Sequence, residues 1–217
     1  MIRTTLLMLL AALLVGCNSP KADDGFVSLF NGRNFEGWTG DTNGYVVVDG
    51  EIKSRIPEPG EHLGNLYTQN EYANFILRFQ FKLTPGANNG LGIRSPLTGD
   101  AAYAGIELQI LENTHEKWAN LKPWQYHGSV YGVAAAERGF QRTPGEWNWQ
   151  EVLVDGRHIK VTLNGHVILD VDLDEVSRDG TIDGHDHPGL ARTKGHIGFL
   201  GHGDLVAFRN ISIKTLH

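Results

Sequence analysis

The sequence predicts an all-β protein, a two-sheet antiparallel sandwich of jelly-roll type. It holds 27 glycines together with five Trp, six Tyr and nine Phe among its 217 residues. Many short runs alternate apolar and polar residues, which is the pattern of half-buried strands. A helical bundle would lose up to about 1 kcal/mol at each internal glycine. No window of helical length carries an apolar stripe with capping residues, so antiparallel strands joined by glycine-rich turns are expected.

Residues 1–16 resemble an export signal, because Arg3 precedes an apolar stretch shorter than the ~20 residues that span a bilayer. The stretch ends at Cys17, the only cysteine, in the position of the lipidated cysteine of bacterial lipoproteins. The alternative is a free thiol near an ordinary secretory cleavage site. We expect removal of residues 1–16, a lipidated Cys17 with a short tether over residues 17–25, and one jelly-roll domain over residues 26–217. The protein would then be exported to the bacterial periplasm or cell surface and attached to the membrane by lipid.

Residues 75–83 alternate most clearly, with apolar side chains at every odd position. Asn164-Gly165 separates the alternating runs 158–163 and 166–171, and this pair is typical of a tight hairpin because both of its residues accept positive φ. Asp155-Gly156 predicts another turn just before, so an antiparallel meander is expected. Further strands are predicted at residues 44–48, 51–55, 65–69, 90–94, 103–111, 196–200 and 206–214.

The charge balance excludes one large class of partner. The formal net charge is −6 at pH 7, without a basic stretch. A protein that follows nucleic-acid phosphates needs clustered Lys and Arg, so no nucleic acid is expected as a partner. A small or neutral ligand fits better.

One predicted strand carries candidate chemistry. In the run 104–112, Ile106, Leu108 and Ile110 form one face, which places Glu107 and Gln109 together on the other. A sandwich whose outer face lines a polar groove would show this pattern, and so would a plain solvated face. The sequence of this strand fits both interpretations equally.

Other candidate residues lie near glycines. Arg94 ends the run 88–94 and could orient a sugar oxygen or pair with Glu107. His127 and Tyr131 stand four residues apart between glycines, and an imidazole can act as an acid or base near neutral pH. His202 follows a predicted strand in the same way. The loop 112–148 is long and aromatic, and loops of this length often carry function.

Residues 183–187, Asp-Gly-His-Asp-His, have the composition of a metal-binding loop. They also fit an exposed polar turn, since such a cluster seldom completes a metal site without a distant third ligand. No serine nucleophile elbow or phosphate-binding loop is present.

Several ordered motifs resemble a known family. They are the segment 26–38 (FVSLFNGRNFEGW), then 89–94 (NGLGIR), 105–110 (GIELQI), 127–132 (HGSVYG), 144–148 (PGEWN) and 208–211 (FRNI). This order is similar to that of the 3-keto-disaccharide hydrolase family, formerly a domain of unknown function. The resemblance implies a concanavalin A-like jelly-roll fold and a small carbohydrate substrate, a 3-keto-glycoside.

The resemblance also implies a reaction. A ketone at carbon 3 of the sugar acidifies the hydrogen on carbon 2, so one base can remove it and the enolate can expel the group on carbon 1; water can then add. Such chemistry needs a base, an oxyanion stabiliser and a leaving-group acid. By position, the base is His127 or Glu107, Arg94 faces the enolate oxygen, His202 or Tyr131 lies near the leaving group, Asn89 and Gln109 hold hydroxyls, and Trp124 or Trp147 stacks on a sugar face. The resemblance implies no definite cofactor, and a divalent metal ion could replace or assist Arg94.

Two other functions share these sequence features. A lectin-like carbohydrate-binding module would use the same groove without turnover, because a fold does not determine a reaction. A conventional glycosidase would need a second carboxylate within about 10 Å of Glu107. Glu146, Glu151 and Asp204 are the candidates for it.

Overall fold

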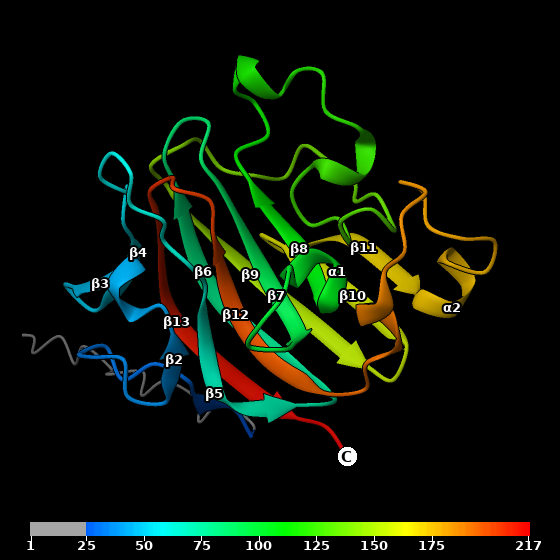
Figure 1. Ribbon diagram of the computed structural model, residues 1–217, viewed down its shortest axis with the longest axis horizontal. Coiled ribbons are helices and arrows are strands. Elements are labelled where there is room, and N and C mark those ends of the chain that lie inside the picture. Colours follow the sequence, from blue (N-terminus) through cyan, green and yellow to red (C-terminus); the bar gives the residue numbers. More distant parts are fainter. Residues whose placement is uncertain (1–24) are drawn as a thin grey trace, which may run out of the picture.

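A computed structural model describes residues 25–217 as two antiparallel sheets packed face to face (Figure 1). The expected export signal and the lipidation site at Cys17 lie outside the described residues. Within residues 25–217, no helix is both long and apolar enough to cross a membrane. The predicted two-sheet sandwich is confirmed.

The larger sheet has eight strands. In spatial order they are β11 (His166–Asp172), β10 (His158–Leu163), β9 (Trp147–Asp155), β6 (Phe75–Leu83), β13 (Val206–Thr215), β4 (Glu51–Ser54) and β3 (Tyr45–Val48), and β1 (Val27–Ser28) pairs with β13. The predicted meander forms β9, β10 and β11. Asn164 and Gly165 take φ of 50° and 89° in its hairpin turn, as the Asn-Gly pair predicts.

The smaller sheet has five strands and carries the polar cavity described below. Their order is β2 (Trp38–Gly40), β5 (Leu66–Tyr72), β12 (Gly195–Gly201), β7 (Asn88–Ser95) and β8 (Ile106–Leu111). The prediction of a strand over residues 103–111 is wrong at its start. Asp100 caps a short helix there, α1 (Ala101–Ala104), by accepting a hydrogen bond from the Ala102 amide (3.0 Å), and β8 begins only after Gly105.

Short helical turns occupy the connections. Another α-helical turn is α2 (Leu173–Val176), and the 3₁₀ turns are η1 (Thr42–Gly44), η2 (Glu116–Trp118), η3 (Pro123–Gln125) and η4 (Pro188–Ala191). Two of them lie in the excursion of residues 112–146 between β8 and β9, which rises at the top of Figure 1. Residues 128–131 return from it along the edge of β8, where the Tyr131 amide donates to the Glu107 carbonyl oxygen (2.9 Å).

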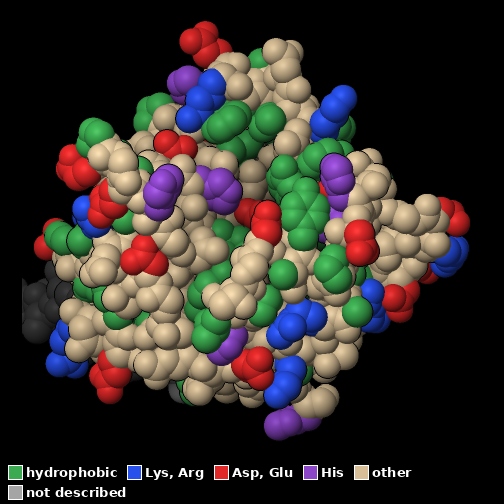
Figure 2. Space-filling view, viewed as in Figure 1, with side chains coloured by type: hydrophobic (Ala, Val, Ile, Leu, Met, Phe, Trp, Pro, Cys, Tyr) green, Lys and Arg blue, Asp and Glu red, His purple; other side chains and the backbone are tan. Residues whose placement is uncertain are grey.

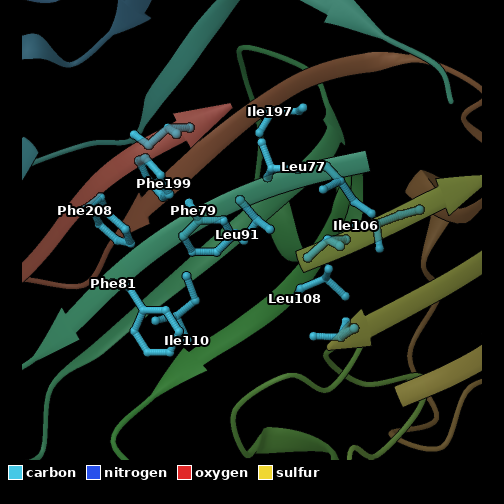
Figure 3. Packing of buried hydrophobic residues seen from close by; sticks show 14 of the residues in the cluster. Leu77, Phe79, Phe81, Leu91, Ile106, Leu108, Ile110, Ile197, Phe199 and Phe208 are labelled. Atoms are coloured by element: carbon cyan, nitrogen blue, oxygen red, sulfur yellow. The ribbon is translucent and has the colours of Figure 1, made fainter. Parts of the chain in front are cut away.

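Aliphatic side chains and stacked aromatic rings fill the space between the sheets (Figure 3). Phe199 of β12 stacks on Phe208 of β13 with ring centres 3.7 Å apart, and Phe79 of β6 meets Phe199 edge-on. The odd positions of β6 are all buried here, as its alternation predicts. Because this layer joins the sheets, it fixes β7, β8 and β12 as a rigid floor for the site.

Candidate active site on the smaller sheet

The outer face of β8 lines a polar cavity of about 410 Å³. Glu107, Gln109 and Leu111 point into it, whereas Ile106, Leu108 and Ile110 lie in the core. The polar-groove interpretation of this strand is therefore correct. Figure 2 shows the molecular face hollowed near its centre, with acidic side chains in the hollow and hydrophobic and histidine side chains around it. The remaining lining comes from Asn88, Asp100, Ala102, Tyr103, Trp118, Leu121, Gln125, Tyr131 and His202.

The carboxyl group of Glu107 lies at the base of this cavity and is largely shielded from solvent, with 5% of the residue exposed. Its Oε1 atom rests on Gly90 of the neighbouring strand, where a Cβ atom would stand only 2.0 Å away. Burial raises the pKa of Glu107 to about 8, and the negative charge of Asp100 adds to the effect. A carboxyl group with this pKa can exchange a proton near neutral pH.

Amide and phenol groups surround this carboxyl group. The side-chain amide of Gln109 lies 3.3 Å from Asn88 Oδ1, and its other amide atom lies 3.3 Å from Glu107 Oε1. With nitrogen turned toward Glu107, it donates a hydrogen bond to the carboxyl oxygen. Gln125 Nε2 donates to Tyr131 Oη (3.3 Å). These groups offer several donors and acceptors to a sugar that enters the cavity.

His202 and Asp100 stand where the cavity continues into a second hollow of about 190 Å³. We call the cavity of about 410 Å³ the larger hollow and the space of about 190 Å³ the smaller hollow. Four residues line both of them: Asp100, Ala102, Glu107 and His202. His202 Nδ1 lies 3.0 Å from the Leu200 carbonyl oxygen, so Nδ1 carries the hydrogen of this bond. The Nε2 atom takes no part in this bond.

Arg94 lies outside this cavity, contrary to the expectation of a shared site with Glu107. At the far end of β7 it takes φ of 49°, and only 2% of the residue is exposed. Its guanidinium donates to the carbonyl oxygens of Ala73 and Arg192 and to Asn74 Oδ1. The left-handed backbone at Arg94 interrupts the alternation within β7, so the side chain leaves the face that alternation assigned to it. Arg94 therefore ties loops together and does not face Glu107.

His127 is also separated from the cavity, because it lies between the two sheets with 1% exposed. Its Nδ1 accepts from the Leu111 amide (3.4 Å), its Nε2 lies 2.9 Å from Gln150 Oε1, and its ring packs on Phe81. Burial lowers the pKa of His127 to about 4, so the ring is neutral at physiological pH. The structure thus places His127 as a hydrogen-bonded core residue.

Three predicted sugar contacts differ from expectation. Asn89 is fully buried on the core side of β7, and its neighbour Asn88 lines the cavity instead. Trp147 lies in the larger sheet, with the cations of Lys82 and Arg209 4.5 Å and 4.0 Å from its ring centre. Trp124 does not line the cavity but meets the edge of Tyr131, with ring centres 5.2 Å apart. Gln109, Tyr131 and His202 are at the cavity, as expected.

Several lining residues were missed by sequence reasoning. The parity of β7 could have identified Asn88, since it shares a face with Gly90 and Gly92. Trp118 and Gln125 belong to the excursion 112–146. Its composition indicated a functional loop but did not single out these two residues. Asp100 and Tyr103 reach the cavity through the α1 turn, which no sequence signal revealed.

In the Asp-Gly-His-Asp-His loop, Gly184, His185 and Asp186 are exposed, as expected of a polar turn, whereas Asp183 and His187 form a buried pair. His187 Nε2 lies 2.9 Å from Asp183 Oδ2, and both side chains are 2% exposed. The His187 ring packs on Tyr103, a cavity residue, with centres 4.6 Å apart. Among residues 25–217, no three His, Cys, Asp or Glu side chains are grouped as metal ligands.

The second carboxylate in the cavity is Asp100, not one of the three predicted candidates. Glu151 pairs with Arg78 (2.7 Å), and Glu146 accepts from the Thr143 amide on the surface. Asp204 accepts a hydrogen bond from the backbone amide of Asn88 (2.9 Å), but it lines neither hollow.

The fold and cavity define a lectin-like β-sandwich with an acid-containing polar site. A Bacillus subtilis protein with a galectin-like fold superposes with a TM-score of 0.53 at 14% identity, over 84% of this chain and 92% of its own. That likeness confirms the fold class alone.

Sequence comparison gives the family. The chain belongs to the 3-keto-alpha-glucoside-1,2-lyase-like family, whose sequence profile matches residues 25–214. It is 25% identical to a 3-keto-disaccharide hydrolase of Bacteroides thetaiotaomicron, over 91% of this chain and 80% of the relative. A protein of Parabacteroides distasonis, named as a candidate glycosyl hydrolase, has 33% identity and a TM-score of 0.76, over 88% of this chain and 99% of its own. These relatives support a glycosyl hydrolase-like function.

Proposed function

We propose that this protein cleaves 3-keto-glycosides by removing the proton on carbon 2 of the oxidised sugar, with Glu107 as the base. The observation that carries this proposal is the position of one buried carboxyl group, with a pKa of about 8, at the base of a polar cavity. A base whose pKa lies near the working pH is well suited to remove a proton beside a ketone. The family match and the name of the Bacteroides relative both point to the same substrate class.

The first step forms an enolate. The electron pair of the C2–H bond forms a C2=C3 double bond, the carbonyl on carbon 3 becomes an oxyanion, and Glu107 holds the proton. Donors aimed at the developing oxyanion lower its energy. Tyr131 Oη and the side-chain amide of Asn88 are lining groups that can supply such donors, in place of Arg94.

The second step expels the group on carbon 1. The C3 carbonyl re-forms, the electron pair moves into a C1=C2 double bond, and the C1–O bond breaks with its pair on the leaving oxygen. We assign His202 Nε2 the delivery of a proton to that oxygen, so this nitrogen must carry a hydrogen in addition to the one on Nδ1 when the step begins. Addition of water, with hydroxyl to carbon 1 and hydrogen to carbon 2, returns the 3-keto sugar and completes a net hydrolysis.

Incubation with a 3-keto-glucoside in heavy water tests this proposal. We expect release of the leaving group and deuterium at carbon 2 of the sugar product. Glu107→Gln should bind the substrate and release no product, because the amide cannot accept the proton.

The alternatives give different outcomes in the same assay. A binding module would hold the ligand without product even as the wild type. Asp100 lines the cavity beside Glu107, so a conventional two-carboxylate glycosidase is the second candidate. It would cleave the unoxidised glycoside and leave carbon 2 unlabelled, which would overturn the proposal.

A further inference from the structure

The two hollows meet at the residues to which the proposed function assigns the chemistry. Glu107, Asp100 and His202 line both of them, so a bond cleaved beside Glu107 has one hollow on each side. We propose that the keto sugar occupies the larger hollow and that the smaller hollow is the binding site of the leaving group, which fits a single polar sugar residue. This inference rests on the proposed function and adds the orientation of the substrate.

The distribution of donors favours this orientation. The enolate oxygen stays on the keto ring, so that ring must lie where donors gather. The donors Tyr131 and Asn88 line the larger hollow only. Some residues line the smaller hollow and not the larger one. Among these, Asn65 has the only amide side chain. In the reverse orientation the oxyanion would have no phenol beside it, and Asn65 would be the one unshared amide side chain left to donate.

Aromatic residues favour the same orientation. Trp118, Tyr103 and Tyr131 line the larger hollow, and none of them lines the smaller one. Aromatic side chains provide a large apolar contact area at a low cost in conformational entropy. Such contacts suit the keto sugar, because its carbon 2 must be held close to the base during proton transfer. The smaller hollow is bordered by Gly99, Ala101 and Gly201, which lets a ligand approach the backbone.

Asn65 is fixed in position to bind a leaving group. Its Oδ1 accepts from the Gly201 amide (3.0 Å), and its Nδ2 donates to Tyr67 Oη (2.9 Å). One amide hydrogen and one oxygen lone pair remain for hydroxyl groups. His202 lies on the shared wall, beside the oxygen that joins the two sugars, as the proposed leaving-group acid requires.

Two substrates and two variants test this orientation. A 3-keto-disaccharide reaches both hollows, whereas methyl 3-keto-glucoside leaves the smaller one empty. We expect Asn65→Ala to lower kcat/KM roughly tenfold more for the disaccharide than for the methyl glycoside, the loss of one or two hydrogen bonds. Trp118→Ala should lower kcat/KM for both substrates by a similar factor. Equal effects of Asn65→Ala on both substrates, or a Trp118→Ala effect confined to the disaccharide, would overturn the orientation.

Product inhibition of the wild type gives the same answer without a variant. Free glucose should compete with a 3-keto-disaccharide that releases glucose, but bind alongside methyl 3-keto-glucoside and not compete with it. Competition with both substrates would contradict a separate leaving-group site. Wild-type inactivity toward both substrates would refute the proposed function itself, which is a distinct result.

Discussion

Glu107 Oε1 occupies the space that a side chain on Gly90 would fill. A Cβ atom at Gly90 would lie 2.0 Å from this oxygen and 2.8 Å from the carboxyl carbon. The two residues sit on adjacent strands, in β8 and β7, where Gly90 pairs with Gln109 and Gly92 with Glu107. The absence of a side chain at Gly90 therefore lets the carboxyl group lie flat against the sheet, beneath the cavity.

Gly90→Ala should displace this carboxyl group. We expect kcat to fall between about tenfold and a hundredfold, because a shift of about 1 Å in a reacting group has an effect of that size. Gly92→Ala is a matched control: its Cβ would crowd Ser95 Oγ and Leu200 but not Glu107. Steady-state kinetics and thermal unfolding of both variants separate loss of geometry from loss of stability. If both variants lose kcat equally, the contact with Gly90 does not set the position of Glu107.

The activity should rise with pH as Glu107 loses its proton. With its pKa raised to about 8, the carboxyl group is mostly protonated at pH 7 and becomes a competent base as pH increases. Asp100→Asn removes a like charge and keeps an acceptor for the Ala102 amide. The rising limb of kcat/KM should therefore move to lower pH in this variant.

A surface carboxylate provides the control for that shift. Glu146→Gln removes the same charge from an exposed loop and should leave the pH profile unchanged. A wild-type profile that is flat from pH 6 to pH 9, or one that Asp100→Asn and Glu146→Gln shift equally, would contradict the assignment of Glu107 as the base.

The same carboxyl group should make the wild type less stable at high pH. The pKa of this glutamate is about 8 in the folded state and near its ordinary value of 4.5 in the unfolded chain. Between these two values the folded state holds a proton that the unfolded state has released, so the free energy of unfolding falls as pH rises through this window. Glu107→Gln cannot ionise and should unfold with roughly 2–4 kcal/mol more stability than the wild type at pH 9, and with similar stability at pH 4. Urea unfolding at the two pH values measures the difference, and an equal difference at both would show that the carboxyl group does not ionise on unfolding as expected.

Much of the fold could be predicted because its signals are local. The alternation of residues 75–83 and the Asn164-Gly165 turn each depend on neighbouring residues, and β6 and the β10–β11 hairpin confirm them. The shared face of Glu107 and Gln109 followed from the same period of two. Where strand parity holds, a sequence assigns each side chain to the core or to the cavity.

The failures in the site share a physical cause. Arg94 adopts a positive φ, and His127 follows an irregular segment, so strand parity does not give the direction of either side chain. Asp100 and Trp118 enter the cavity from turns whose positions depend on tertiary contacts. Residue type suggested a catalytic role for Arg94 and His127. The same side chains commonly have structural roles, because a guanidinium can bind carbonyl oxygens and an imidazole can bind a buried amide.

His127 should matter for stability and not for chemistry. His127→Ala leaves a core void and an unpaired Gln150, which should cost about 2–4 kcal/mol. Because the folded pKa is lowered to about 4, the unfolded state binds a proton first, and wild-type stability should fall as pH drops from 6.5 toward 4. His127→Gln should weaken that dependence while kcat/KM of the folded protein stays close to wild type. A His127 variant with wild-type stability and no activity would show that His127 takes part in the reaction.

Substitution of Arg94 should lower the stability of the protein without changing its catalytic activity. Its planar guanidinium joins the carbonyl oxygens of Ala73 and Arg192, two chain segments that the fold brings together from opposite parts of the sequence. Arg94→Met leaves these partly buried acceptors without their charged donor and should cost roughly 2–3 kcal/mol. Arg94→Lys should recover only part of this, because one ammonium group cannot reproduce the forked geometry. Neither variant should change kcat/KM measured well below its unfolding temperature, since no atom of Arg94 lines the hollows of Glu107. Loss of kcat in a variant with wild-type unfolding would instead require Arg94 to reach the substrate, which the described geometry does not allow.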